Sequence, residues 1–228
     1  SNITLYARFE PVDHMVTLIY SQSEQAIQLG YKHGEQFSPA DVKIFNNGLA
    51  VTAWSTRKND MSLMDEFDGK VTEDVTLYPA RWSRSATYTR NTQELVGSDG
   101  FGKEFSEYPD LKSLFGKSVA ELKASSTDVT DECGYVKAEI ALSLTLHEID
   151  DGYQLFRVSN SSGKNLCEKE FEHGSGKKDT STATYTFKFT ADIDDLTDTL
   201  TIDYDARGQW DDDWILEKTV MKITLYQE

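Results

Sequence analysis

The chain has 228 residues, with 23 Lys and Arg against 39 Asp and Glu, and its net charge is −16. Because like charges repel, this acidity excludes a general affinity for nucleic acid or for anionic membranes. Hydrophobic residues make up 38 % of the chain, enough for a folded core. No apolar run approaches the roughly 18–20 residues that a membrane helix needs, so we expect no membrane insertion. The chain opens on the strand-like run Ile3–Tyr6 without a signal peptide, which predicts a piece of a longer protein.

A segment near the N-terminus is echoed 72 residues later. The run Ile3–Phe9 (ITLYARF) recurs as Val75–Trp82 (VTLYPARW), with one inserted proline. Both copies alternate apolar and polar residues and end on an aromatic residue, which favours a half-buried strand. Two further strand-like runs, Val16–Tyr20 and Leu49–Trp54, lie between the copies with turn residues separating them. Short Thr-Leu-Tyr strings also recur by chance in β proteins. The prediction of a repeated module therefore depends on the residues between the two copies.

Taken together, these residues resemble the internalin-type B-repeat, also called the Listeria–Bacteroides repeat. The matching positions are Tyr31 and Gly34 at the turn, Pro39, the middle strand Gly48–Trp54, and the closing signature Val71–Trp82 with its acidic Asp74. The chain departs from the pattern at Gln22–Glu24, at Ala53 and at Pro79. The resemblance covers about residues 12–82 and makes residues 1–11 the tail of a preceding repeat. It implies a small β-grasp-like module, repeated in bacterial surface proteins and secreted adhesins, that brings no catalytic residues with it.

From Ser83 the composition changes, and residues 83–228 are expected to form a second domain. Residues 83–102 are rich in Ser, Thr, Asn and Gly, which predicts a linker or an opening loop. Apolar residues at helical spacing then predict one short helix over residues 111–122, with Pro109 and Asp110 in its first turn.

The rest of this domain is predicted to be an antiparallel, jelly-roll-like β-sandwich. Residues 136–147 alternate apolar and polar side chains without interruption, which is the period of a strand. Further strands are expected at residues 153–159, 165–173, 183–190, 199–206 and 214–226. Six or more strands with polar outer faces favour two packed sheets, and a domain of this size buries enough surface to fold alone.

Acidic residues concentrate in the predicted loops. Residues 191–213 hold nine Asp and one basic residue, and Asp211, Asp212 and Asp213 are the densest point. Calcium takes six to eight oxygen ligands, which short Asp side chains on loops supply. A simple meander would gather these residues with Asp151 at one rim of the sandwich, whereas a Greek-key order would scatter them. Asp151 and Asp211–Asp213 are therefore candidate calcium ligands, and a solvated acidic loop is the alternative, since no Asp-x-Asp-x-Asn-Gly loop is present.

Aromatic residues beside this acidic cluster suggest a sugar site. Trp210 and Trp214 flank the three Asp residues, and Tyr204 precedes them on a predicted strand. Sugars stack their C–H faces on aromatic rings while carboxylates accept their hydroxyl hydrogens. Two core tryptophans that bracket a turn are the alternative, but their spacing across three Asp residues argues against burial of both.

A third group of carboxylates gives an enzymatic alternative. Glu168, Glu170 and Glu172 alternate along a predicted strand, so neighbouring members lie roughly 6–7 Å apart on one face. The two catalytic carboxylates of glycosidases lie at similar separations. In a hydrolase of this kind, Glu170 or Glu172 would be the general acid and a neighbouring carboxylate the nucleophile. A solvated strand face has the same pattern, and we therefore expect a non-enzymatic protein.

Cysteine and histidine add little to the functional reading. Cys133 and Cys167 permit one disulfide or two buried thiols. Two cysteines are too few for a disulfide scaffold, and these two are too far apart in the sequence for the close pairs of a zinc site. No pair among the four histidines has a metal-binding spacing such as i, i+4.

The sequence as a whole predicts a fragment of a bacterial cell-surface or secreted, adhesin-like protein located outside the cell. The repeat would act as a spacer that contacts neighbouring repeats, and the sandwich would bind a glycan or a host or cell-surface protein. Two alternatives stay open, a purely structural stalk segment and a glycan-active hydrolase that uses Glu170 and Glu172.

Overall fold

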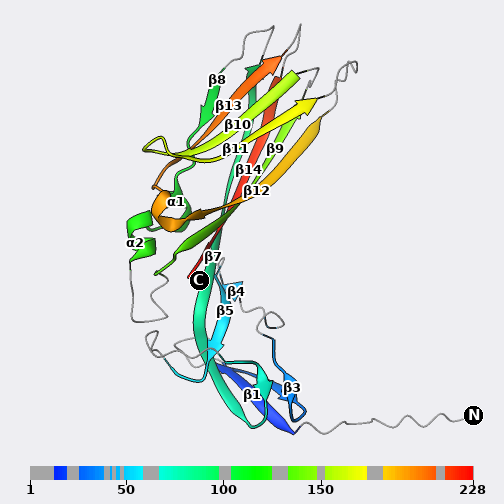
Figure 1. Cartoon of the computed structure of the whole chain (residues 1–228), viewed down its shortest axis with the longest axis vertical. Coiled ribbons are helices and arrows are strands. Elements are labelled where there is room, and N and C mark those ends of the chain that lie inside the picture. Colours follow the sequence, from blue (N-terminus) through cyan, green and yellow to red (C-terminus); the bar gives the residue numbers. More distant parts are fainter. Residues whose placement is uncertain are drawn as a thin grey trace, which may run out of the picture. The chain divides into compact units, whose positions relative to one another are not determined.

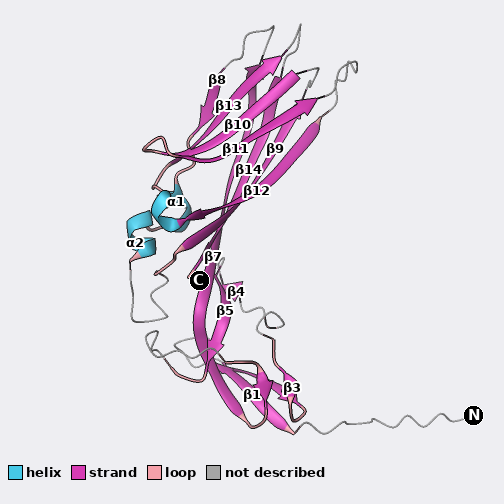
Figure 2. Ribbon diagram, in the orientation of Figure 1, coloured by secondary structure: helices cyan, strands magenta, loops and turns pink. Residues whose placement is uncertain are grey.

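The chain divides into two compact units between Trp82 and Ser83, the position at which the composition changes. The computed structural model describes residues 13–19, 26–38, 42, 45–46, 49–58, 67–97, 104–124, 133–147, 152–173, 182–208 and 214–227. Residues 1–11, the predicted tail of a preceding repeat, lie outside these ranges. The units are drawn in Figures 1 and 2 and are described separately below.

The first unit is built on a mixed sheet in the order β2–β1–β7–β5. Strands β1 (His14–Ile19) and β2 (Ala26–Tyr31) form an antiparallel hairpin, and β4 (Phe45–Asn46) and β5 (Leu49–Ser55) form another. The first residues of β7 (Val75–Gly97) run parallel to β1, with Val16 opposite Val75. Two hairpins joined through a central parallel pair form the expected β-grasp-like arrangement. Its core contains Val16, Leu18, Phe37, Val51, Trp54, Val71 and Leu77.

A small two-stranded sheet closes the side of this core that contains Phe37. It pairs β3 (Glu35–Gln36) with β6 (Lys70–Val71). Gly69 has a φ of +88°, and a Cβ at this position would lie 2.5 Å from the carbonyl oxygen of Phe37. Only glycine combines this backbone conformation with so close an approach, so Gly69 sets the position of the small sheet.

The second unit is a sandwich of two four-stranded antiparallel sheets. One sheet has the order β12–β9–β14–β7 and the other β11–β10–β13–β8. Their bounds are β8 (Glu104–Glu107), β9 (Lys137–His147), β10 (Gly152–Asn160), β11 (Asn165–His173), β12 (Ala183–Asp192), β13 (Leu200–Gly208) and β14 (Trp214–Tyr226). All connections except β10–β11 cross from one sheet to the other, and this eight-stranded order is that of a jelly roll. The predicted fold class and the strands predicted after residue 135 are confirmed.

Residues 83–97 are the second half of β7, and the predicted linker over residues 83–102 is wrong for them. They pair with β14 from Ser83 opposite Tyr226 to Gly97 opposite Trp214. Their Ser, Thr and Asn residues stand mainly on the outward positions of the strand, and Thr is a good strand former. The composition was therefore that of a solvated strand face; residues 98–102 lie outside the described residues.

Two short helices replace the single helix predicted over residues 111–122. Helix α1 (Leu111–Phe115) begins after Asp110, whose carboxylate accepts from the Ser113 N–H, and it ends at the C-cap Gly116. Helix α2 (Val119–Lys123) begins with a reciprocal capping box between Ser118 and Glu121. The capping residues between the helices stop one and start the other, so the continuous apolar spacing was misleading.

Candidate functional site

Four connections between strands leave from and return to the same end of the sandwich. At this end Gly97 lies opposite Trp214, His147 opposite Ile215, and Gly152 opposite both His173 and Gly208. In Figure 1, β9, β11 and β13 finish at the upper end of the second unit, where β10, β12 and β14 start. We call this the loop end of the sandwich, defined by Gly97, Gly152, His173, Gly208 and Trp214.

The loop end brings together the chain positions that flank most of the predicted site residues. Asp151 directly precedes β10, and residues 209–213, with Trp210 and the three Asp residues, join β13 to β14. Trp210, Asp151 and Asp211–Asp213 themselves lie outside the described residues, as does the side chain of Trp214. The expectation that a Greek-key order would scatter these segments is wrong, because consecutive jelly-roll strands still alternate in direction and so place alternate connections at one end.

Tyr204 is buried in the core of the sandwich and is separate from the other predicted sugar-binding residues. Its side chain is 1 % exposed, and its ring meets those of Phe105 and Phe156 at centroid distances of 5.7 and 5.6 Å. Its hydroxyl forms a 2.8 Å hydrogen bond with the hydroxyl of Thr219 on β14. A ring in this position has no face open to a surface ligand, so the prediction that Tyr204 stacks on a sugar is corrected.

A buried carboxyl group next to Tyr204 was missed by the sequence analysis. Glu107 on β8 is 0 % exposed, and its Oε2 accepts a 3.3 Å hydrogen bond from the Tyr88 hydroxyl. Its Oε1 makes no hydrogen bond to the described residues, and it lies 3.8 Å from the Nε of Arg90. The Arg90 guanidinium also lies 5.4 Å from the ring centre of Phe105. These residues form a polar cluster at the edge of the apolar core of the sandwich.

The environment of this cluster favours neutral side chains. Burial raises the pKa of Glu107 above its ordinary value, although the Thr219 hydroxyl and the Arg90 charge lower it. Burial and the nearby Glu107 carboxylate raise the pKa of Tyr204 well above its ordinary value. A buried acid that binds its proton tightly is a feature of many functional sites, and also of some structural networks.

The strand period contained a signal for this carboxyl. Phe105 and Glu107 are two residues apart on one strand and therefore share a face, while Tyr108 is 64 % exposed. Polarity alone places the tyrosine inside and the glutamate outside. Because Glu107 shares the inward face of the strand with Phe105, the strand period correctly places Glu107 inside and Tyr108 outside.

The carboxylates of the hydrolase alternative lie on an open sheet face. Glu168 is exposed on β11 and makes an ion pair with Arg157 of β10, whose Nη2 is 2.8 Å from the Glu168 Oε2. Glu170 is also exposed and lies opposite Leu155. The side chain of Glu172 is outside the described residues. The described part of this face therefore has the pattern of a solvated strand surface.

The described ranges contain neither a metal centre of three or more protein ligands nor a disulfide. No group of three or more His, Cys, Asp or Glu side chains there is arranged to hold a metal ion. Cys133 and Cys167 are both free thiols and half-buried, and burial raises the pKa of Cys167. Among the described helices, neither length nor apolar character suffices to cross a membrane.

Comparison with known proteins yields only loose structural similarity. No family model and no curated protein matches the chain. Among solved structures, an infectious bursal disease virus VP2 subviral particle is 11 % identical with a TM-score of 0.36, covering 77 % of this chain and 41 % of that chain. A CBM4 structure is 10 % identical with a TM-score of 0.31, covering 64 % of this chain and 71 % of that one.

A third similar structure is dimeric latent PorU from Porphyromonas gingivalis, at 7 % identity and a TM-score of 0.38. It is covered over 18 % of its length, while 93 % of this chain is matched. This chain thus spans less than half the length of the VP2 and PorU chains. At these scores the similarities carry no argument about ligand or activity, and the loop end and the Glu107 cluster are assessed on their own geometry.

Proposed function

We propose that the second unit is a non-enzymatic recognition module that binds a glycan or a protein at its loop end. The observation that carries this proposal is the convergence of the strand ends at Gly97, Gly152, His173, Gly208 and Trp214. Four connections start from this one rim, and one of them contains Trp210 and three aspartates and is followed directly by Trp214, the first residue of β14. Binding residues concentrate on loops held by a rigid scaffold, and the eight-stranded sandwich is such a scaffold.

We further propose that the first unit is a B-repeat-type spacer in a bacterial surface or secreted protein. The order of elements supports this, because a hairpin, a glycine turn at Gly34, a strand that ends beside Trp54 and a closing strand follow the residues of the resemblance. The parallel pairing of Val16 with Val75 joins the opening and closing strands of the module. Modules of this size serve to space and display a recognition domain.

Glycan binding should depend on the two tryptophans of the loop end. We expect at least one glycan of a panel to raise the melting temperature of the full chain. A ligand present at 100 times its dissociation constant increases the free energy of unfolding by about 2.7 kcal/mol. The shift should disappear in Trp214→Ala or Trp210→Ala and persist in Glu170→Gln, which changes an exposed residue of β11. Differential scanning calorimetry measures all three. A shift that survives both tryptophan variants and is lost in Glu170→Gln would move the site to the outer face of β11.

Calcium should act at the same rim if the acidic cluster is its site. We expect calcium to raise the melting temperature, EDTA to reverse the effect, and the combined Asp211→Asn, Asp212→Asn and Asp213→Asn variant to remove it. The control is Asp203→Asn, which changes a carboxylate on β13 that accepts from the Ser106 hydroxyl, away from the loop end. A calcium shift that is unchanged in the triple variant would show that the rim is only a solvated acidic loop.

A further inference from the structure

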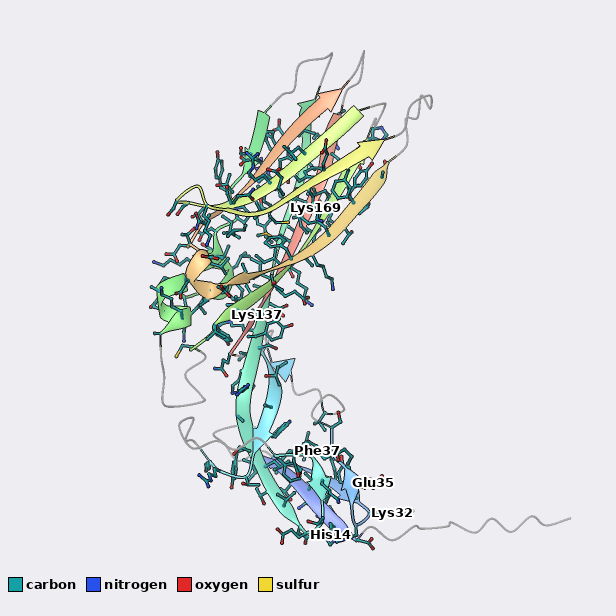
Figure 3. The ribbon with its side chains drawn as sticks, viewed as in Figure 1. His14, Lys32, Glu35, Phe37, Lys137 and Lys169 are labelled. Atoms are coloured by element: carbon teal, nitrogen blue, oxygen red, sulfur yellow. The ribbon has the colours of Figure 1, made fainter. Side chains whose placement is uncertain are left out.

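Two histidines of the first unit meet across the hairpin although they are 19 residues apart in the chain. The Nε2 of His14, on β1, lies 3.0 Å from the Nδ1 of His33, which follows β2. The register places His14 opposite Tyr31, and the turn that follows β2 then returns His33 to the same point. Figure 3 shows His14 at the same end of the first unit as Lys32 and Glu35. A spacing rule for helices cannot find such a pair.

A carboxylate lies near each of the two histidines. Asp74 Oδ1 accepts a 2.8 Å hydrogen bond from the Met15 N–H and lies 3.8 Å from the His14 Nδ1. Asp13 Oδ2 accepts a 3.0 Å hydrogen bond from the backbone N–H of His33. The Asp74 carboxylate attracts a proton to Nδ1 of His14 and so favours the tautomer whose Nε2 lone pair is directed at His33. A carboxylate behind an imidazole is the outer-shell arrangement that orients metal-binding histidines.

The spacing of the two nitrogens suits a shared metal ion. Two nitrogens bound at about 2.0–2.1 Å to one ion lie about 2.9 Å apart at a right angle and about 3.4 Å apart in a tetrahedron. The observed 3.0 Å is close to the first value and a few tenths of an ångström below the second. His33 is exposed and His14 is 21 % exposed, so the rings have room to turn until both lone pairs meet on the ion.

We infer that His14 and His33 form a two-imidazole binding site for a divalent transition metal ion, with Asp74 as the outer-shell partner of His14. Imidazole nitrogens suit Cu²⁺, Zn²⁺ and Ni²⁺, and Cu²⁺ binds most tightly in this series. The ion replaces the hydrogen between the two rings: the proton on Nδ1 of His33 moves through solvent to Nε2 of the same ring, so both imidazoles bind as neutral ligands. Water molecules fill the remaining coordination positions. The ion's charge is also favoured by Asp13 and Asp74, the carboxylates next to the rings. This site would be distinct from the calcium site proposed at the loop end.

The test titrates Cu²⁺ into the untagged full chain and counts the bound nitrogens by electron paramagnetic resonance. We expect the tightest site to show two imidazole nitrogens and its affinity to fall at least tenfold in both His14→Ala and His33→Asn. His147→Ala and His173→Ala are the matched controls and should leave it unchanged, because these histidines belong to the second unit. Circular dichroism confirms that each variant keeps its fold. Equal affinity in the wild type and in both hairpin variants, or a signal without two nitrogens, would overturn the inference.

A second variant tests the outer-shell role of Asp74. Asp74→Asn keeps an oxygen that accepts from the Met15 N–H but removes the negative charge near the His14 Nδ1. We expect about a tenfold loss of Zn²⁺ affinity by isothermal titration calorimetry, as is typical for such partners. An unchanged affinity would show that the two imidazoles act without Asp74.

Discussion

Phe156→Ala should destabilise the second unit by about 3–5 kcal/mol. Phe156 lies at the centre of the β11–β10–β13–β8 sheet and is fully buried. Its ring packs edge-on to Tyr204 at 5.6 Å and tilted to Phe171 at 5.5 Å. Truncation leaves a cavity between the two sheets that these rings cannot fill. Urea unfolding of the full chain, followed by near-ultraviolet circular dichroism, measures the loss.

The matched control for Phe156→Ala is Tyr108→Ala, which removes an aromatic ring that is 64 % exposed. Its effect should stay within about 0.5 kcal/mol, as for most surface substitutions. If Phe156→Ala costs no more than Tyr108→Ala, then Phe156 does not pack between two sheets, and the sandwich assigned to the second unit is incorrect.

Glu107→Gln should stabilise the protein at neutral pH by about 1–3 kcal/mol, because it removes a buried carboxyl whose Oε1 has no hydrogen bond among the described residues. Burial raises the pKa of Glu107, so the folded state holds this proton more tightly than the unfolded state. The contribution of Glu107 to stability is therefore fully present below the unfolded pKa of about 4.3 and is lost as the pH rises through the folded pKa. The advantage of Gln should grow with pH across that window and then level off.

The measurement for Glu107→Gln is the difference in unfolding free energy between variant and wild type from pH 4 to pH 8. Using the difference removes the contributions of the other carboxylates, two of which, Asp110 and Glu121, have lowered pKa values and the opposite pH dependence. Glu170→Gln, on the exposed face of β11, should show no such trend. A variant less stable than the wild type at every pH would mean that Arg90 stabilises the Glu107 charge by more than burial costs it.

Local patterns were sufficient to predict most strands and the fold class. Residues 137–147 alternate buried and half-buried side chains along β9, as their sequence period predicts, and Phe187 on β12 is buried in the same way. Residues 83–97 are the main exception, because their outward Ser and Thr residues give this strand the composition of a linker. Their partner is β14, more than 100 residues later in the chain, and local composition contains no information about that pairing.

The candidate sites were predictable only in part, for a related reason. Residue types along the chain pointed to Trp210, Trp214 and the three Asp residues, but the strand register decides which connections share an end. Tyr204 is an aromatic residue close in sequence to the acidic segment, but it alternates with Leu200 and Ile202 and lies with them in the core. The His14–His33 contact depends on a hairpin and the turn after it, so separation in sequence conceals it.

The most direct test of the central claim, recognition at the loop end, is a nuclear magnetic resonance titration of the ¹⁵N-labelled full chain with the panel glycan that stabilises it most. The account predicts that backbone amide shifts change mainly at Gly97, Gly152, Gly208 and Trp214 and in the connections between them. Shifts that instead cluster on the outer face of β11 around Glu168 and Glu170 would contradict it.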